Sequence, residues 1–227
     1  MFARIGIMVL AGWCCVAFAQ ADDPKTIMTQ RGKLVFQDDF TSSVDKAWKK
    51  SKGKIEVTGG SLRVAELKED MHGAAMRYKL PVGTNLVFQY DFKFDGAKST
   101  TLSLNATKGH LSRVSVTPAS FSVRKDSTDK NVTDKAMQLD QRKIALKTGI
   151  WHTLVAELQG KEMLATIDGE NLIYGKHDKI DQLKANFGLT VAGESVSFKN
   201  LRVWEAQPNS SWETERQKII DSRSPGK

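Results

Sequence analysis

Residues 151–204 decide the fold. They contain WHTLVAEL (residues 151–158), QGKE (159–162), MLATI (163–167), DGE (168–170) and NLIY (171–174), followed by FGLTV (187–191) and VSFKNLRVW (196–204). Runs rich in β-branched and aromatic residues are separated by turn residues such as Gly160 and the pair Asp168-Gly169. Short strands spaced roughly 8–12 residues apart and divided by such turns are typical of an antiparallel sandwich. This segment therefore predicts an all-β fold.

Further strands are predicted upstream. Residues 34–40, 54–64, 101–106, 112–117 and 121–124 have strand composition, and the 54–64 run contains a Gly59-Gly60 hairpin turn. Residues 85–94 alternate strictly, so their apolar side chains share one face. We expect a dry core between two sheets. Its predicted members are Phe88, Tyr90, Phe92, Val114, Val116, Leu154, Ile167, Leu189 and Phe198.

The order of these runs, together with FQDDF (residues 36–40) and Trp48, resembles the concanavalin A-like jelly roll. Within that superfamily, residues 34–204 are most similar to the 3-keto-disaccharide hydrolase-type domain, once a domain of unknown function. The resemblance implies a secreted role in sugar metabolism, since some members cleave 3-keto-glycosides. TLSLN (101–105) stands where that family has a Gly-rich Asn-Ser-Gly strand. No catalytic residue is therefore carried over.

Two segments depart from the strand pattern. Residues 126–148 are polar, which predicts a long loop or a short helix, serving either as a lid over a cleft or as a plain connection. Near the end of the chain, Ser210 and Glu213 have capping-box spacing and predict a short helix that docks on the sandwich or contacts a partner. The expected organisation is a signal peptide at 1–21, a β-sandwich domain at 22–206 and a C-terminal helical tail at 207–227.

The signal peptide is predicted from Arg4, the short apolar stretch 5–16, and small residues at the cleavage positions around Ala19 and Ala21. The apolar stretch is too short to span a bilayer, so no stable membrane span is expected after its removal. The predicted location is outside the cell, in the periplasm or in the cell envelope. Both cysteines, Cys14 and Cys15, lie in this segment. The mature chain would contain no disulfide and no thiolate metal site.

Charge limits the choice of partners. The formal net charge is +8, and Arg4 is the only charged residue of the signal segment, so the mature chain keeps +7. A moderately basic sandwich favours anionic partners such as an acidic polysaccharide or an anionic cell-surface polymer, although the same charge also serves solubility alone. The expected partner is a carbohydrate, with anionic glycans among the candidates. The lysines are scattered and not interleaved with aromatic residues, so nucleic-acid binding is not expected.

Motifs for several chemistries are missing from the sequence. Only four histidines occur and none are paired at helical spacing, so no metal and no cofactor is expected. The Glu-x-Asp-x-x-Glu run with which retaining glucanases of this fold place two carboxylates does not occur; the nearest acidic cluster, Glu66, Glu69 and Asp70, has the wrong spacing. Neither a Gly-x-Ser-x-Gly elbow nor a phosphate loop occurs.

What remains is a polar sheet face. Outward parity on successive strands, beside small residues that leave space, predicts one ligand-binding cluster on the concave sheet. Its members are Arg77, Asp91, Asn105, His110 and Arg113. Arginine and asparagine donors with a carboxylate suit sugar hydroxyls, and a histidine suits acid or base chemistry. The predicted function is a secreted glycan-handling protein that binds or weakly hydrolyses a saccharide. The alternatives are a structural or adhesive envelope protein, and ordinary cross-strand pairing on a solvated face.

Overall fold

The computed structural model describes residues 24–127 and 134–223, and these are predominantly β-strands. Two single-turn 3₁₀ helices, η1 (Lys68–Asp70) and η2 (Asp178–Ile180), and one α-helix, α1 (Trp212–Asp221), complete the described elements. The strands are β1 (Thr29–Asp38), β2 (Lys49–Lys52), β3 (Lys54–Thr58), β4 (Ser61–Ala65), β5 (Ala74–Gly83), β6 (Leu86–Asn105), β7 (His110–Thr117), β8 (Ser120–Lys125), β9 (Met137–Lys143), β10 (His152–Gln159), β11 (Glu162–Ile167), β12 (Asn171–Lys176) and β13 (Lys184–Pro208). The predicted all-β sandwich with a short C-terminal helix is confirmed.

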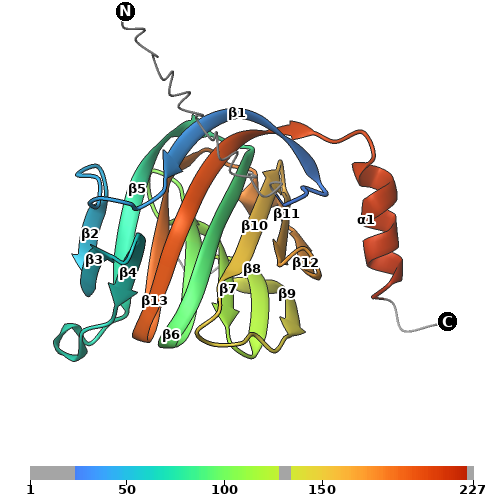
Figure 1. Ribbon diagram of the computed structural model, residues 1–227. Coiled ribbons are helices and arrows are strands. Elements are labelled where there is room, and N and C mark those ends of the chain that lie inside the picture. Colours follow the sequence, from blue (N-terminus) through green and yellow to red (C-terminus); the bar gives the residue numbers. More distant parts are fainter. Residues whose placement is uncertain (1–23, 128–133, 224–227) are drawn as a thin grey trace, which may run out of the picture.

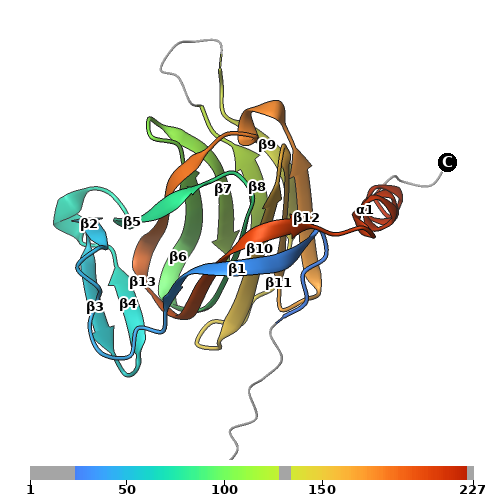
Figure 2. The same ribbon diagram turned by 90° about the horizontal axis from the view of Figure 1, so that it is seen from above.

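The strands form two layers joined through β6 and β13. The front layer has the order β12-β11-β10-β6-β13-β4-β3, and Figure 1 shows its central strands side by side. The back layer runs β2-β5-β13-β6-β7-β8-β9, while β1 adds to the C-terminal part of β13. The first half of β6 pairs with β10 and the second half with β7, so the strand belongs to both layers. Figure 2 shows the two layers from above.

Glycines allow the two long strands to bend between the layers. Gly96 and Gly193 both have positive φ, 86° and 92°, in the region where the β6–β13 register shifts. A Cβ on Gly193 would lie 2.7 Å from the backbone nitrogen of Lys98, closer than real Cβ atoms come. The prediction of separate strands at 85–94 and 101–106, and at 187–191 and 196–204, is therefore wrong: each pair is one continuous, bent strand.

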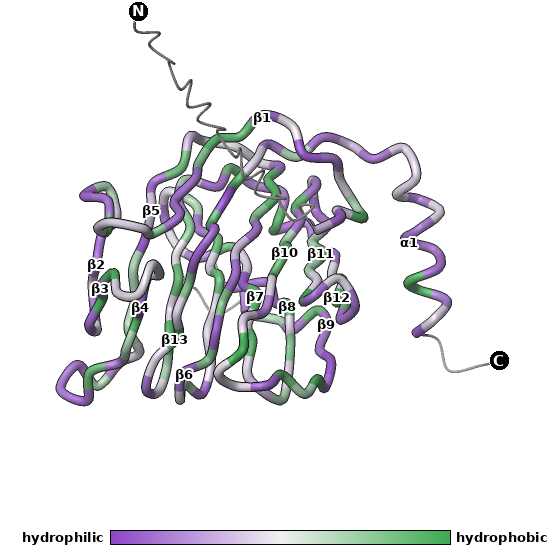
Figure 3. The backbone as a smooth tube through the Cα atoms, viewed as in Figure 1, coloured by the Kyte–Doolittle hydropathy of each residue, from purple (hydrophilic) through white to green (hydrophobic). Residues whose placement is uncertain are grey.

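The core lies between the layers and contains every predicted member. All nine residues of the predicted core are fully buried, each with 0% exposure. Phe88, Tyr90, Phe92 and Phe94 of β6 pack in this core, and their rings contact neighbouring aromatic side chains edge to face. Figure 3 shows hydrophobic and hydrophilic residues alternating along the strands.

Residues 126–148 contain a strand that the sequence did not reveal. β9 pairs with β8 as the last strand of the back layer, so the prediction of a loop or short helix is wrong for residues 137–143. An edge strand is half solvated, and β9 carries only Met137 and Leu139 as apolar residues, so its alternation is too short to recognise. Residues 128–133 lie outside the described residues.

The C-terminal helix docks on the sandwich, as one of the two alternatives predicted. Trp212 packs with Met28 and Leu164. The capping box is wrong: the helix begins at Trp212, its N-cap Ser211 makes no side-chain capping bond, and the Ser211 amide donates to Asn209 Oδ1. In the described part of the chain, no helix has the length and apolar content needed to cross a membrane. The predicted signal peptide, with Cys14 and Cys15, lies outside the described residues.

Candidate functional site: a cavity on the outer face of the back layer

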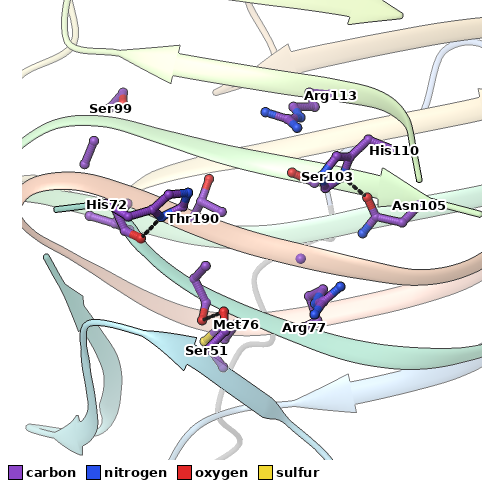
Figure 4. A pocket seen from close by; sticks show the side chains of 15 residues that line it. Ser51, His72, Met76, Arg77, Ser99, Ser103, Asn105, His110, Arg113 and Thr190 are labelled. Carbon is purple, nitrogen blue, oxygen red and sulfur yellow. Dashed lines mark hydrogen bonds between the residues drawn. The ribbon is translucent and has the colours of Figure 1, made fainter. Parts of the chain in front are cut away.

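A cavity of about 320 Å³ opens on the outer face of the back layer. It is built by β2, β5, β13, β6 and β7, with part of the turn before β5 (Figure 4). Its lining residues are Ser51, His72, Gly73, Ala75, Met76, Arg77, Ser99, Ser103, Asn105, His110, Arg113, Gly188, Thr190, Val191 and Ala192.

Strand alternation determines which side chains reach this face. Met76, Leu102, Val114 and Leu189 are buried in the core. Their neighbours along the same strands must then point outward, which is why Arg77, Ser103, Arg113 and Gly188 gather on the opposite face.

The floor of the cavity is made of very small residues. Gly188 of β13 lies directly opposite Ser103 of β6 and Arg77 of β5. A Cβ on Gly188 would meet Arg77 Cγ and the carbonyl oxygen of Met76, both at 3.1 Å. The missing side chain therefore leaves room above the sheet, and Arg77 and Arg113 lie on opposite sides of the β13 ribbon at this point (Figure 4). Glycine inside a strand often marks such a close approach.

A hydrogen-bonded chain of polar side chains closes one end. Asn105 Nδ2 donates to Asn186 Oδ1 at 2.7 Å, and Asn105 Oδ1 lies 2.5 Å from His110 Nδ1. Because the amide oxygen can only accept, the imidazole hydrogen is assigned to Nδ1, which leaves Nε2 as an acceptor. Burial, helped by the charge of Arg113, lowers the pKa of His110. The ring is therefore neutral at pH 7 and can take part in hydrogen bonds from both nitrogens.

Arg113 is held by a buried carboxylate while still reaching the cavity. Its Nε lies 2.7 Å from Asp126 Oδ2, and Arg124 Nε lies 2.9 Å from Asp126 Oδ1. The side chain of Asp126 is 5% exposed and that of Arg113 is 26% exposed. Two guanidinium groups thus share one carboxylate. The ion pair orients Arg113 without neutralising the site.

The structure brings four of the five predicted site residues together. Arg77, Asn105, His110 and Arg113 line the cavity, whereas Asp91 does not. Asp91 lies in the front-layer half of β6, where it accepts hydrogen bonds from Thr153 Oγ1 and Asn200 Nδ2, both at 2.7 Å. Its outward parity was predicted correctly. Its placement was wrong because residues 85–94 and 101–106 are one strand passing between layers, not two neighbouring strands.

Strand alternation did not reveal the residues that shape the cavity. Ser51, Ser103, Gly188 and Thr190 were not predicted to belong to it. A glycine interrupting the apolar run FGLTV was the available signal for the floor. Its partner across the sheet could not be known, because Ser103 is distant in the sequence and the pairing depends on the bend in both long strands.

The cavity has donors and acceptors but no acid. No Asp or Glu is among its lining residues, which all belong to the described part of the chain. Within the same described ranges, no group of three or more His, Cys, Asp or Glu side chains is gathered as a metal site would require. The two guanidinium groups and the amide can donate hydrogen bonds to a ligand, and the serine and threonine hydroxyls can both donate and accept them.

Comparison with known proteins identifies the fold. No family model matches the chain, and no curated protein sequence matches it. Among solved structures, it is similar to a protein of unknown function with a galectin-like fold from Bacillus subtilis (TM-score 0.61, 12% identity, 80% of this chain and 100% of that one). It is also similar to carbohydrate-binding module CBM66 from Bacillus subtilis (0.54, 15%, 70% and 96%) and to SCLam, a non-specific endo-β-1,3(4)-glucanase of family GH16 (0.58, 12%, 83% and 98%).

The chain has the jelly-roll sandwich fold. At these identities the likeness concerns the fold alone. The narrower resemblance to the 3-keto-disaccharide hydrolase-type domain remains a prediction from the sequence.

Proposed function

We propose that this chain is an exported protein that binds a saccharide in the cavity on the outer face of the back layer. The observation that carries the proposal is the cavity itself. Small residues form its floor, while hydroxyl, amide, imidazole and guanidinium groups converge on it. Such a hollow with a few fixed polar groups is typical of a small-ligand site. Two proteins of similar fold, a carbohydrate-binding module and a glucanase, support a sugar as the ligand class.

Binding is favoured over hydrolysis by the composition of the cavity. Most glycosidases hold two carboxyl groups about 5–10 Å apart around the scissile bond. Two histidines, His72 and His110, line the cavity, and no carboxylate accompanies them. Hydrolysis of a 3-keto-glycoside, which the sequence resemblance implies, would have to use His110 or His72 as the acid or base. We therefore propose binding as the primary activity.

A change that fills the cavity without altering charge tests the proposal. Ser103 is on the floor and Ser122 of β8 is on the same sheet face outside the cavity. Purified protein is screened on a glycan array, and the affinity of a captured glycan is measured by calorimetry. We expect Ser103→Val to weaken binding by about tenfold or more, the equivalent of one lost polar contact plus steric exclusion.

Ser122→Val is the matched control and is expected to leave the affinity unchanged. Equal affinities for both variants would mean that the glycan binds elsewhere, and an array with no captured glycan would reject saccharide binding. A reducing-sugar assay on the captured glycan separates binding from hydrolysis: no sugar release is expected.

A further inference from the structure

A single row of opposed residues crosses the back layer through the cavity. Strand by strand, the row runs through Lys49, Arg77, Gly188, Ser103, Arg113 and Arg124. Directly opposed residues of antiparallel strands project to the same face. The row thus has two cations at each end and the two floor residues in the middle. With strands about 4.8 Å apart, the backbones of Arg77 and Arg113 are separated by roughly 14 Å.

Negative charge is scarce around this row. Among the described residues, Asp126 is the one carboxylate that forms an ion pair with the row, and Arg113 and Arg124 already share it beneath the surface. Arg77 is exposed, and among the described residues it has no ion-pair or hydrogen-bond partner. An unpaired guanidinium on one side of the floor faces a half-paired one on the other. Arg77 can turn toward an anion placed between them without breaking another contact, and Arg113 can offer its terminal nitrogens while its Nε stays on Asp126.

Cations outnumber carboxylates around the cavity. Burial lowers the pKa of His110, the charges of Arg113, Arg77 and Arg124 lower it further, and Asp126 opposes them. A hollow lined by one sign of charge concentrates ions of the opposite sign.

We propose that the cavity recognises an anionic saccharide, whose carboxylate or sulfate group is seated over Gly188 and Ser103 between Arg77 and Arg113. This inference rests on the proposed function and narrows its ligand class. The planar guanidinium group matches both anions with paired hydrogen bonds. Lys49 and Arg124 extend the same row beyond the cavity, which suits a polyanionic chain lying across the strands. The floor, free of large side chains, leaves space for the sugar ring that carries the anion.

Three polymers test the charge requirement on the full-length mature protein. Dextran and dextran sulfate share a backbone and differ in sulfation, and polygalacturonate presents carboxylates. Calorimetry at one fixed salt concentration is expected to show binding of dextran sulfate, polygalacturonate or both, with dextran at least about tenfold weaker. The two anionic arms identify which group the seat prefers. Arg77→Ala and Arg113→Ala are each expected to weaken binding about tenfold.

Arg63→Ala is the matched control because Arg63 lies on β4, in the front layer, where it donates to Ser195 Oγ. The Arg63→Ala change removes the same charge from the opposite side of the molecule. The affinity of this variant for the anionic polymer should stay within about twofold of the parent. Equal losses in all three variants would show non-specific charge attraction and overturn the seat. Equal affinity for dextran and dextran sulfate, with Arg77→Ala unaffected, would also overturn it but leave saccharide binding standing. If no polymer and no arrayed glycan binds, both proposals fall. Thermal unfolding confirms that each variant folds. Arg77→Ala is the simplest variant to interpret, because Arg77 has no ion-pair or hydrogen-bond partner in the part of the chain that the structure describes.

Discussion

At the scale of the residue, Phe92 shows how a strand pattern becomes stability. Its ring is fully buried and lies 5.7 Å from the rings of both Phe94 and His152. Truncation to alanine would remove this contact area and leave a cavity that a close-packed core fills only in part. We expect Phe92→Ala to lower the free energy of unfolding by about 3–5 kcal/mol in chemical denaturation. A loss below about 1 kcal/mol would contradict the burial of this face.

Lys184 is a residue whose charge opposes its position. The side chain is fully buried at the start of β13, and Nζ donates to the Ile180 carbonyl at 2.8 Å. Burial lowers the pKa of Lys184 to about 8. The unfolded chain keeps its proton up to about pH 10.4, so between these values the unfolded state binds more protons and stability rises with pH. As pH falls through 8 this gain is lost, because both states are then protonated.

We therefore expect Lys184→Met to remove a rise of about 2 kcal/mol in unfolding free energy between roughly pH 8 and pH 10. The measurement is urea denaturation across that range. Lys179→Met is the control, since Lys179 is exposed on η2 close by. The lowered pKa of Lys184 would be refuted if the unfolding free energy of the parent did not rise over this range relative to that of the Lys184→Met variant.

At the scale of the element, helix α1 is attached to the sandwich mainly through Trp212, with Ile219 and the Arg216–Glu162 ion pair beside it. Ten residues are too few for a stable helix in water, and this one is mostly hydrophilic (Figure 3). Trp212 supplies the attachment: it is 8% exposed, its indole donates to Glu162 Oε2 at 3.0 Å, and its ring packs on Tyr174 at 5.6 Å. The helix should therefore remain formed only while Trp212 is seated.

Trp212→Ala is expected to release the helix at a cost of about 3–5 kcal/mol in docking free energy. Trypsin should then cleave at Arg216 and Lys218 much faster than in the parent, whereas Ile220→Ala, at a 40% exposed position, should not change the rate. Unchanged cleavage in the tryptophan variant would show that the helix is held by other contacts.

Elements also mark the limit of what the sequence could predict. Alternation located the inward residues correctly, since inside and outside differ by the period of the strand. It could not show that β6 and β13 each cross between layers, because Gly96 and Gly193 look the same whether a strand ends or bends. The misplacement of Asp91 follows from that one ambiguity. β9 was missed because a half-solvated edge strand needs few apolar residues.

At the scale of the whole molecule, the chain is tied to the sandwich from Ile27 onward. Glu157, buried in β10, accepts hydrogen bonds from the backbone nitrogens of Ile27 and Thr29 at 2.8 and 2.6 Å, and from Thr29 Oγ1 at 2.8 Å. Desolvation raises the pKa of this carboxyl, and the hydrogen bonds from Ile27 and Thr29 oppose that rise because they stabilise the charged form. Cleavage on the N-terminal side of residue 24 would leave this attachment intact.

Export of the protein with removal of residues 1–21 is therefore compatible with the fold and remains a prediction from the sequence. Signal peptidase requires small residues before the cut, which Ala17, Ala19 and Ala21 offer. Intact-mass measurement of protein isolated from its native envelope is expected to show a start at Gln20 or Asp22. Replacing Ala19 and Ala21 together by arginine should block processing and accumulate a precursor that retains Met1, since bulky charged side chains do not fit the cleavage site. An intact Met1 in the mature pool of the unaltered protein would show that the segment is not removed.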